Sequence, residues 1–502
     1  MRTVDSDFTD LPLHDLADAA LQRARDLGAT HADLRVERVR SSHLVLRDAR
    51  LTSSTDDTDL GLGVRVVVDG TWGYAATTAL TTRDAARVAE EAVTLARVSR
   101  PLSTERVELA AEPVHADRHW VSSYDVDPFA VATQDQVALL EDWSRRLLSQ
   151  GVSHVDATVA AVKEHKFYAD TAGTSTTQQR VRLQPEIDGV LVTGEAMETM
   201  RTVAPPAGRG WEYLTGGTWD WDGELGRLPE QLREKLAAPS VEAGHYDLVV
   251  DPTNLWLTIH ESVGHATELD RALGYEAAYA GTSFATLDQL GSLQYGSTHM
   301  HVTGDRTAEH GLATVGFDDE GVQAQSWDIV RGGVLVGYQL DRRMAAMHGL
   351  GSPAGRSNGC AFADSPRHTA VQRMANVSLQ PDPHGPDLDG LVAGVDRGIY
   401  VVGDKSWSID MQRYNFQFTG QRFYRIENGR LAGQVKDVAY QATTTDFWRS
   451  MTAVGGPGTY LLGGAFNCGK AQPGQVAPVS HGCPPAVFRD VNILNTVQEG
   501  QQ

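Results

Sequence analysis

Two histidines and a glutamate stand within six residues of one another, at His260, Glu261 and His265. The run before them, Leu255-Trp256-Leu257-Thr258-Ile259, is apolar, which predicts a mostly buried helix. Titratable side chains in an apolar setting need partners, because an unpaired buried polar group is costly. A divalent metal ion is the partner that fits two imidazoles and a carboxylate. The competing interpretation is a helix whose histidines are satisfied in the core and whose glutamate is solvated.

The spacing of the histidines is unusual for a metal-binding helix. The familiar zinc-protease pattern places histidines at i and i+4, on one helix face. His260 and His265 stand at i and i+5, about 140° apart on a regular helix. A single π-turn would bring both onto one ion, and Gly264 is the residue expected to tolerate that distortion. Glu261 can then reach a metal-bound water without being a ligand, so its expected role is general base.

A catalytic zinc site usually has three protein ligands and an open position, so a third ligand must come from outside this helix or from its end. The candidates are Cys468, Cys360, Cys483, His481, Glu268 and the group His299, His301 and His310. Cys468 follows a glycine-rich run at 455–464, whose small residues let the backbone pass close to a site. His299 and His301 are expected on one side of a strand, where a solvated face is the simpler interpretation. Cys483 is expected in a loop.

Composition limits the classes of function. A chain of 502 residues should hold two or three domains. The formal net charge of −21 and the pI of about 5.2 argue against nucleic acid and anionic membranes as partners. Three cysteines suit a reducing compartment, and residues 1–10 lack a signal-peptide pattern. No apolar run approaches ~18 residues. We therefore expect a cytoplasmic protein without a transmembrane helix.

Two similar helix-and-strand units are expected in the N-terminal part of the chain. The first has an amphipathic helix from Leu13 to Leu27, alternating strands at 32–36 and 44–46, and a hairpin that turns at Asp69-Gly70. The second has a helix capped by Thr133 and then a series of alternating strands. Because the order of elements repeats, the sequence indicates an internal duplication.

The C-terminal half is expected to be β-rich around one central helix. A buried strand at 246–250 leads into the histidine-bearing helix, which Thr253 or Asn254 would cap. Segments that resemble strands dominate beyond residue 296. The predicted fold class is therefore α+β. The expected domains are 1–102, an N-terminal α/β unit, 103–240, a second α/β unit with a linker, and 241–502, a β-rich domain with the metal-binding helix at its centre.

Motifs along nearly the whole chain resemble the TldD/PmbA family of metallopeptidases. The pattern His260-Glu261-x-x-x-His265, followed by Glu268 and Asp270, is similar to the family's active-site helix. Further similar motifs stand at 61–66 with 69–73, 373–376, 398–401, 426–429 and 468–470. Their order agrees with the family from about residue 13 to residue 480.

The resemblance implies a zinc peptidase in which His260, His265 and Cys468 bind the ion and Glu261 activates a zinc-bound water. The family's paralogous subunit lacks the HExxxH motif, so this chain resembles the catalytic member. A heterodimer with a TldE/PmbA-like subunit follows from the resemblance, a homodimer being the other arrangement. Its substrates would be unfolded peptides or the leader peptides of modified peptide products.

Three further roles are predicted around this centre. Glu268 and Asp270 are candidates for orienting the histidines, although both would also be ordinary surface carboxylates. Tyr338 is a candidate donor to the oxyanion, although a strand aromatic is its simpler role. The segment 332–338 is the expected sheet edge to which a peptide would add as a strand. Two other functions stay open, a non-catalytic scaffold subunit of such a complex and a zinc amidohydrolase of small molecules.

Overall fold

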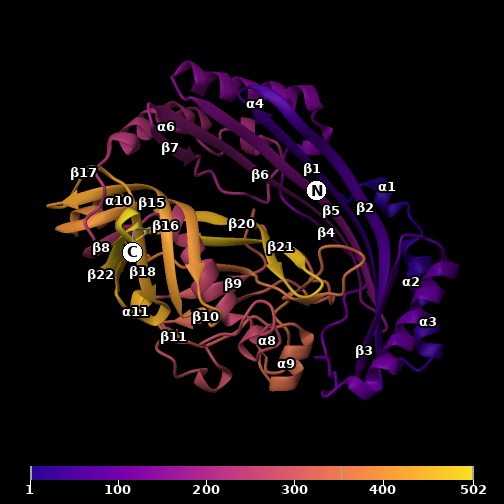
Figure 1. The fold of residues 1–502 in the computed structure, drawn as a ribbon. Coiled ribbons are helices and arrows are strands. Elements are labelled where there is room, and N and C mark those ends of the chain that lie inside the picture. The colour runs from indigo at the N-terminus through magenta and orange to yellow at the C-terminus, as the bar shows by residue number, and fades with distance from the viewer. Residues whose placement is uncertain (1–2, 352, 500–502) are drawn as a thin grey trace.

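A long, curved sheet formed by the first 200 residues wraps around a β-rich C-terminal half (Figure 1). The structure is a computed structural model that describes residues 3–351 and 353–499. The first sheet has the order β3-β2-β1-β5-β6-β4, with β7 paired to β6. Its strands are β1 (His31–Arg47), β2 (Arg50–Val68), β3 (Thr71–Thr77), β4 (Arg118–Val121), β5 (His154–Asp170), β6 (Ser175–Thr193) and β7 (Ala196–Arg201).

The two faces of this sheet differ in chemistry because successive side chains of a strand point to opposite sides. On β1, Leu34 and Val36 are fully buried in an apolar core under the helices. Arg35 and Glu37 alternate with them and are buried on the inner face, against the C-terminal half. The prediction of two separate strands at 32–36 and 44–46 is wrong, because β1 pairs with β2 and β5 along its whole length.

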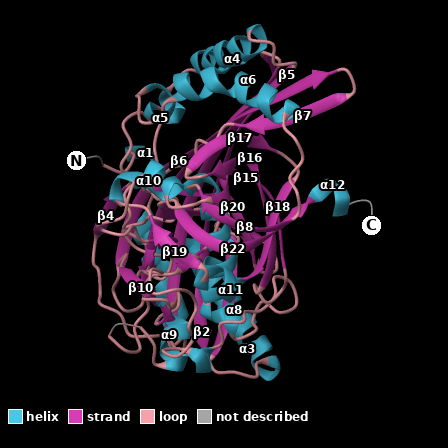
Figure 2. Ribbon diagram, turned by 90° about the vertical axis from the view of Figure 1, so that its left-hand side faces the viewer, coloured by secondary structure: helices cyan, strands magenta, loops and turns pink. Residues whose placement is uncertain are grey.

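Helices cover the outer face at both ends of the sheet (Figures 1 and 2). They are α2 (Leu13–Asp26) and α3 (Thr82–Ser99) at one end and α4 (Thr133–Ser149) and α6 (Trp221–Ala237) at the other. The predicted helix at Leu13 and the turn at Asp69-Gly70 are both present. Thr133 is the first helical residue of α4 and not its N-cap, which is Ala132. In the described residues, no helix is both long and apolar enough to span a membrane.

The order helix, three strands, helix occurs twice, as α2-β1-β2-β3-α3 and α4-β5-β6-β7-α6. The two copies share one sheet, since β1 of the first pairs with β5 of the second. The boundaries near residues 102 and 240 stay predictions about where independently folding units end.

The C-terminal half is built on a second seven-stranded sheet. Strands β15, β8, β22, β18 and β16 pair in that order, and β16 pairs back to β15, so the sheet closes on itself. Its strands are β8 (Gly244–Val250), β15 (Arg397–Ile409), β16 (Asn415–Glu427), β17 (Arg430–Val435), β18 (Val438–Thr443), β19 (Met451–Val454) and β22 (Ala486–Asn495). With helices on one face of the first sheet and strands dominating here, the fold class is α+β, as predicted.

Smaller elements complete this half. They are the sheet of β9 (Val302–Asp305), β10 (Ser326–Arg331), β11 (Val334–Leu335) and β14 (Asn376–Leu379), the pair β12 (Ala361–Phe362) and β13 (Val371–Gln372), the hairpin of β20 (Leu461–Lys470) and β21 (Gln475–Cys483), and the helices α1 (Ser6–Thr9), α5 (Glu212–Thr215), α8 (Leu269–Ala272), α9 (Arg342–His348), α10 (Leu388–Ala393), α11 (Thr444–Arg449) and α12 (Thr496–Glu499).

The segment 332–338 does not offer the open edge that the sequence predicts. Only Val334 and Leu335 of this segment form a strand, β11. The other side of β11 is already paired, since Gly291 donates to the Leu335 carbonyl and Leu335 donates to the Leu293 carbonyl. A substrate strand would have to displace this loop, so the prediction is wrong.

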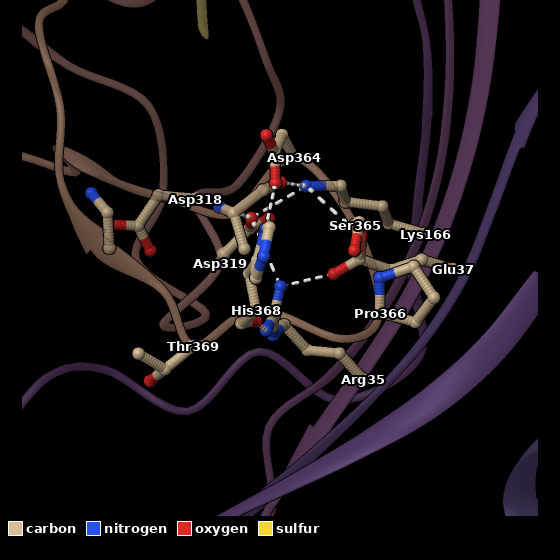
Figure 3. A network of polar contacts seen from close by, with 12 residues as sticks. Arg35, Glu37, Lys166, Asp318, Asp319, Asp364, Ser365, Pro366, His368 and Thr369 are labelled. Atoms are coloured by element: carbon tan, nitrogen blue, oxygen red, sulfur yellow. Dashed lines mark hydrogen bonds and ion pairs between the residues drawn. The ribbon is translucent and has the colours of Figure 1, made fainter. Parts of the chain in front are cut away.

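Buried ion pairs join the inner face of the first sheet to the C-terminal half (Figure 3). Lys166 on β5 donates to Asp319 at 2.6 Å and to the Ala363 carbonyl at 2.7 Å. Arg35 pairs with Glu37 and donates to the His368 carbonyl at 2.5 Å. These contacts fix the sheet against the half of the chain that carries the histidine motif.

The network gives a prediction for stability. Lys166→Met leaves the buried Asp319 carboxylate without its closest cation, and breaking a buried pair in this way costs about 3–5 kcal/mol. The urea midpoint should therefore fall clearly. Arg23→Ala is the control, because Arg23 and Glu90 form an exposed pair worth about 1 kcal/mol or less. Equal shifts in the two variants would contradict the role given to the network.

Candidate metal centre

The helix that carries the histidines changes its geometry at the motif. Asp251 caps α7 (Pro252–Ile259) by accepting a hydrogen bond from the Thr253 amide, so neither Thr253 nor Asn254 is the cap. Residues His260–Gly264 then form a π-helical turn, followed by a 3₁₀ turn at His265–Thr267. The predicted π-turn is present, and it brings the two imidazole rings to 4.6 Å between centroids.

The irregular turns redirect carbonyl groups, and side chains satisfy them. Gln339 donates to the Gly264 carbonyl at 2.7 Å, Thr267 donates to that of Val263 at 2.8 Å, and Tyr295 donates to that of Ser262. Buried carbonyls without partners would destabilise the turn, so these donors are part of what holds it.

Gly264 has a different role from the predicted one. Its φ of −54° is ordinary right-handed backbone, which any residue adopts. A Cβ atom at this position would lie 2.5 Å from the Met374 sulfur and 3.3 Å from the His481 ring. Glycine thus accommodates the close approach of these side chains, and any larger residue would require Met374 to shift.

Cys468 reaches the histidines from β20. The strand has an irregularity between Ala465 and Cys468, and the Cys468 Sγ lies 3.5 Å from the His265 Nε2. Possible ligand atoms of His260, His265 and Cys468 all lie within 4.8 Å of one another. A nitrogen and a sulfur ligand of tetrahedral zinc lie about 3.5 Å apart, given bond lengths of ~2.0 and ~2.3 Å. The three residues therefore fit a zinc ion in spacing and in donor type.

The tautomer of His265 is fixed by Glu268. The Nδ1 of His265 lies 2.9 Å from the Glu268 carboxylate, so this nitrogen carries the proton and donates. The Nε2 lone pair is then free on the side of Cys468. Burial lowers the pKa of His265 well below its usual value, which keeps the ring neutral. Glu268 thus makes the contact that its predicted orienting role requires.

His260 is fixed in the same way through a second histidine. The Nδ1 of His481 lies 2.8 Å from the Val377 carbonyl, which can only accept, so His481 donates there. Its Nε2 must therefore accept, 2.7 Å away, from the Nδ1 of His260. The Nε2 lone pair of His260 is left for a metal. His481, a candidate third ligand from the sequence, instead lies behind the centre, and burial lowers the pKa of its ring to about 4.

A buried charge cluster surrounds Glu268. Lys470 lies 3.1 Å and Arg271 lies 3.2 Å from its carboxylate. Burial alone would raise the pKa of Glu268, but the two cations hold it well below the usual value. Asp270 pairs with Lys470 at 2.7 Å and contacts neither histidine, so its support of the site passes through Lys470.

Glu261 has an arginine partner that the sequence did not reveal. The Nη1 of Arg413 donates to the Glu261 carboxylate at 2.5 Å from the turn between β15 and β16. Arg413 has a φ of 63°, a left-handed conformation that side chains rarely adopt. Burial nevertheless raises the pKa of Glu261 above its usual value. A carboxylate with a raised pKa suits a base that must also release its proton near neutral pH.

The thiol of Cys468 lies beside a buried cation. Arg373 donates to the Cys468 carbonyl at 2.5 Å, and its Nε and Nη1 have no partner in the described part of the chain. Burial raises the pKa of Cys468 to about 11 in spite of this charge. Metal binding would have to displace the thiol proton, and Arg373 stabilises the resulting thiolate.

The other cysteines lie outside the centre. Cys360 is fully buried, and burial raises the pKa of its thiol to about 12. Cys483 is the last residue of β21 and not part of a loop as predicted, and its thiol donates to the Pro252 carbonyl. Within residues 3–351 and 353–499, the group of His, Cys, Asp and Glu side chains close enough to hold a metal is His260, His265 and Cys468.

The remaining candidate residues, three histidines and Tyr338, have surroundings that do not involve the candidate metal centre. His299 and His301 are exposed and precede β9, so they do not share a strand face. His310 contacts the Gly208 carbonyl. The Tyr338 hydroxyl donates to the Ala285 carbonyl at 2.9 Å, so this residue has the simpler structural role.

Family models match two parts of the chain. The model described as the PmbA/TldA metallopeptidase C-terminal domain matches residues 243–495, and that of PmbA/TldA metallopeptidase domain 1 matches residues 32–96. A metalloprotease from Methanothermobacter thermautotrophicus is 26% identical over 496 residues, which are 98% of this chain and 100% of that protein. A zinc metalloprotease TldD homolog from Saccharolobus solfataricus is 23% identical over 84% of this chain and 88% of its own length.

Solved structures share the fold. The structure of a candidate modulator of DNA gyrase from Thermotoga maritima matches with a TM-score of 0.76 at 16% identity, over 96% of this chain and 100% of that one. TldE from Thermococcus kodakarensis matches with a TM-score of 0.68 at 14% identity, over 94% and 98% of the two chains.

The spacing of the three candidate ligand atoms predicts the effect of losing one. Cys468→Ala should reduce zinc affinity by more than about 100-fold, beyond the 10–100-fold that loss of a neighbouring hydrogen-bond partner typically causes. Elemental analysis and chelator competition would measure it. Cys360→Ala and Cys483→Ala are matched controls and should retain the metal. Undiminished zinc in the Cys468 variant would remove this residue from the centre.

The hydrogen bond from His260 to His481 gives a second prediction. His481→Phe removes the acceptor for the His260 Nδ1 proton, so zinc affinity should fall about 10–100-fold. His481→Gln offers an amide oxygen near the same position and should retain more of the affinity than the phenylalanine variant. Equal affinities in these two variants would mean that His481 acts only by filling space.

Proposed function

Because the chain belongs to the TldD/PmbA family of metallopeptidases, we propose that it is a zinc-dependent peptidase that hydrolyses unfolded peptides or leader peptides. The observation that supports this most strongly is the set of three buried donors at zinc spacing, with both imidazole tautomers fixed so that Nε2 is free. His260, His265 and Cys468 would hold the ion.

Glu261 performs the proton transfers in this proposal. A zinc ion supplies Lewis acidity, which polarises the scissile carbonyl and makes water a better nucleophile near pH 7. Glu261 accepts the proton that water loses and later gives it to the leaving amine. Its raised pKa supports both steps.

Arg413 replaces Tyr338 as the proposed donor to the oxyanion. Its Nη1 donates to Glu261 and its Nη2 donates to the Ala280 carbonyl, while its buried Nε has no partner in the described part of the chain. A fixed cation beside the base stabilises negative charge that develops on the substrate carbonyl.

The edge of β20 is the proposed binding site for the peptide backbone. In the described residues β20 pairs only with β21, and it runs directly to Cys468. A cavity of about 280 Å³ lies along this strand, between Trp256 and Trp407 on one side and loop 202–206 on the other. Pairing of backbones gives affinity without demanding a particular sequence, which suits unfolded substrates.

A TldE/PmbA-like partner in the cytoplasm is part of the proposal. Trp407, Met411 and Tyr279 are exposed large apolar side chains, and the turn that holds Met411 also holds Arg413. Exposed apolar patches of this kind are typical of interaction surfaces. The fold likeness to TldE supports a paralogous subunit, with a homodimer as the other arrangement.

The two alternative functions make different demands. A scaffold subunit would not need stoichiometric zinc, so metal content of the purified protein separates it from a peptidase. A zinc amidohydrolase would prefer small amides over peptides, and a paired substrate screen distinguishes the two.

Glu261→Gln tests the function directly. The variant should retain zinc and lose at least about 100-fold in peptide hydrolysis, the usual scale for loss of a general base. The assay uses an unstructured peptide, with and without the paralogous subunit, and zinc is measured in the same samples. Glu242→Gln, on the surface, is the control. Activity of the Glu261 variant near the wild-type level would refute the assigned role.

A further inference from the structure

A second cavity lies on the inner face of the first sheet, next to the β20–β21 hairpin. Its volume is about 370 Å³. It shares Phe466 and Asn467 with the cavity along β20, and Cys468 follows these two residues. Much of the wall is apolar, and the apolar side chains are those of Val39, Val162, Phe466, Val476 and Pro478. The cavity therefore adjoins the proposed metal centre without containing any of its ligands.

Arg182 brings a positive charge that this wall does not balance. It extends from β6 and is 8% exposed. Its Nη1 donates to Glu164 at 3.2 Å, but Glu164 already receives two hydrogen bonds from Arg180, at 2.9 and 3.1 Å. Two guanidinium groups thus share one carboxylate. Lys166, 3.7 Å from Glu164, adds to the positive charge.

One donor of Arg182 has no partner. Its Nε is buried and donates to no oxygen in the described residues. Burial and the neighbouring Arg180 lower the pKa of Arg182 to about 10, so the group stays charged at neutral pH. A buried cation with a free donor is costly unless an anion pairs with it.

The other charged groups at this cavity are already paired. Asp364 accepts from His368 at 2.6 Å and from the Val476 amide at 2.8 Å, and Figure 3 shows the two side chains together. Asp59 pairs with Arg367 at 3.2 Å. An incoming anion would therefore meet Arg182 as the cation with a free donor.

We propose that Arg182 binds the C-terminal carboxylate of a peptide substrate. The proposal rests on the proposed function, since it assigns one end of the peptide that lies along β20. A charge-assisted pair between a guanidinium and a carboxylate is among the stronger polar contacts.

The chemistry of the wall selects a terminal carboxylate over an acidic side chain. Unfolded peptides differ in every side chain, but each one ends in a carboxylate. The apolar side chains of the wall make no specific polar contact with the last residue of a peptide, while Arg182 recognises the group common to all. The charges that line the cavity along β20 are balanced, because Glu186 and Asp404 offset Arg201 and Lys405. The C-terminal carboxylate of the peptide is therefore assigned to the cavity that contains Arg182.

The test compares three N-acetylated pentapeptides bound to the full chain. The first is Ala-Ala-Phe-Ala-Ala with a free carboxylate, the second is the same peptide as a carboxamide, and the third is the carboxamide with Asp at the fourth position. Binding is measured by calorimetry in the Glu261→Gln background, where hydrolysis does not interfere. The free acid should bind about 10–100-fold more tightly than either amide, the scale of one hydrogen bond to a charged group.

Arg182→Gln should remove this preference and leave the affinity for the amides unchanged, which also shows that the variant is folded. Arg367→Gln is the matched control, because Arg367 lies on the same cavity but is 70% exposed in its side chain. It should keep the preference. In active enzyme, Arg182→Gln should raise KM for the free acid by a similar factor with little change in kcat.

The outcomes separate this inference from the proposed function. Equal binding of acid and amide by the unsubstituted Arg182 protein overturns the inference, and so does tight binding of the internal Asp peptide. If wild-type enzyme then hydrolyses both peptides, the peptidase proposal stands. If it hydrolyses neither although the acid binds preferentially, the peptidase proposal fails and the carboxylate site remains.

Discussion

The imidazoles of His260 and His265, five residues apart, lie side by side inside an apolar core. Much of the structure around them follows from the constraint of bringing both rings to the same place. A regular helix would separate them, so the backbone takes one π-helical turn at His260–Gly264. That turn redirects carbonyls, and Gln339 and Tyr295 supply the donors. Gly264 lies against Met374 in this turn, so a larger residue would require Met374 to shift. The juxtaposition of the two imidazoles, the small residue at position 264 and the buried amide of Gln339 all belong to this one turn.

The sequence predicted what depends on local geometry and missed what depends on tertiary partners. The π-turn follows from the angle between residues i and i+5, so it was predictable from the positions of His260 and His265 alone. Cys468 was one candidate among several until the family resemblance selected it. The partner of His260 could not be predicted, because His481 is 221 residues away and its role depends on the Val377 carbonyl. Arg413, which contacts Glu261, lies 152 residues away in a left-handed turn, and no pattern in the sequence indicates this contact.

The first sheet separates two kinds of stabilisation on its two faces. Leu34 and Val36 bury apolar surface under helices, whereas on the other face Arg35 pairs with Glu37 and lies 3.5 Å from Asp319 of the C-terminal half. Apolar packing tolerates small shifts, but paired charges require defined positions, because a displaced partner leaves an uncompensated charge. The charged face therefore fixes the concave surface against residues 319, 363 and 368 of the C-terminal half. Periodicity predicted the strands but not this division, since alternation identifies two faces without showing what covers the polar one.

The residues of the candidate metal centre come from segments that are far apart in the sequence and are therefore synthesised at different times. The helix that carries His260 and His265 lies near the middle of the chain, whereas Cys468 follows His265 by 203 residues and His481 follows His260 by 221. Until these later segments have left the ribosome and β20 and β21 have folded, neither the candidate third ligand nor the acceptor behind His260 is in place. A nascent chain therefore lacks the complete set of donors until the β20–β21 hairpin has been made. The long sequence separation makes formation of this donor set one of the last steps in the folding of the C-terminal half.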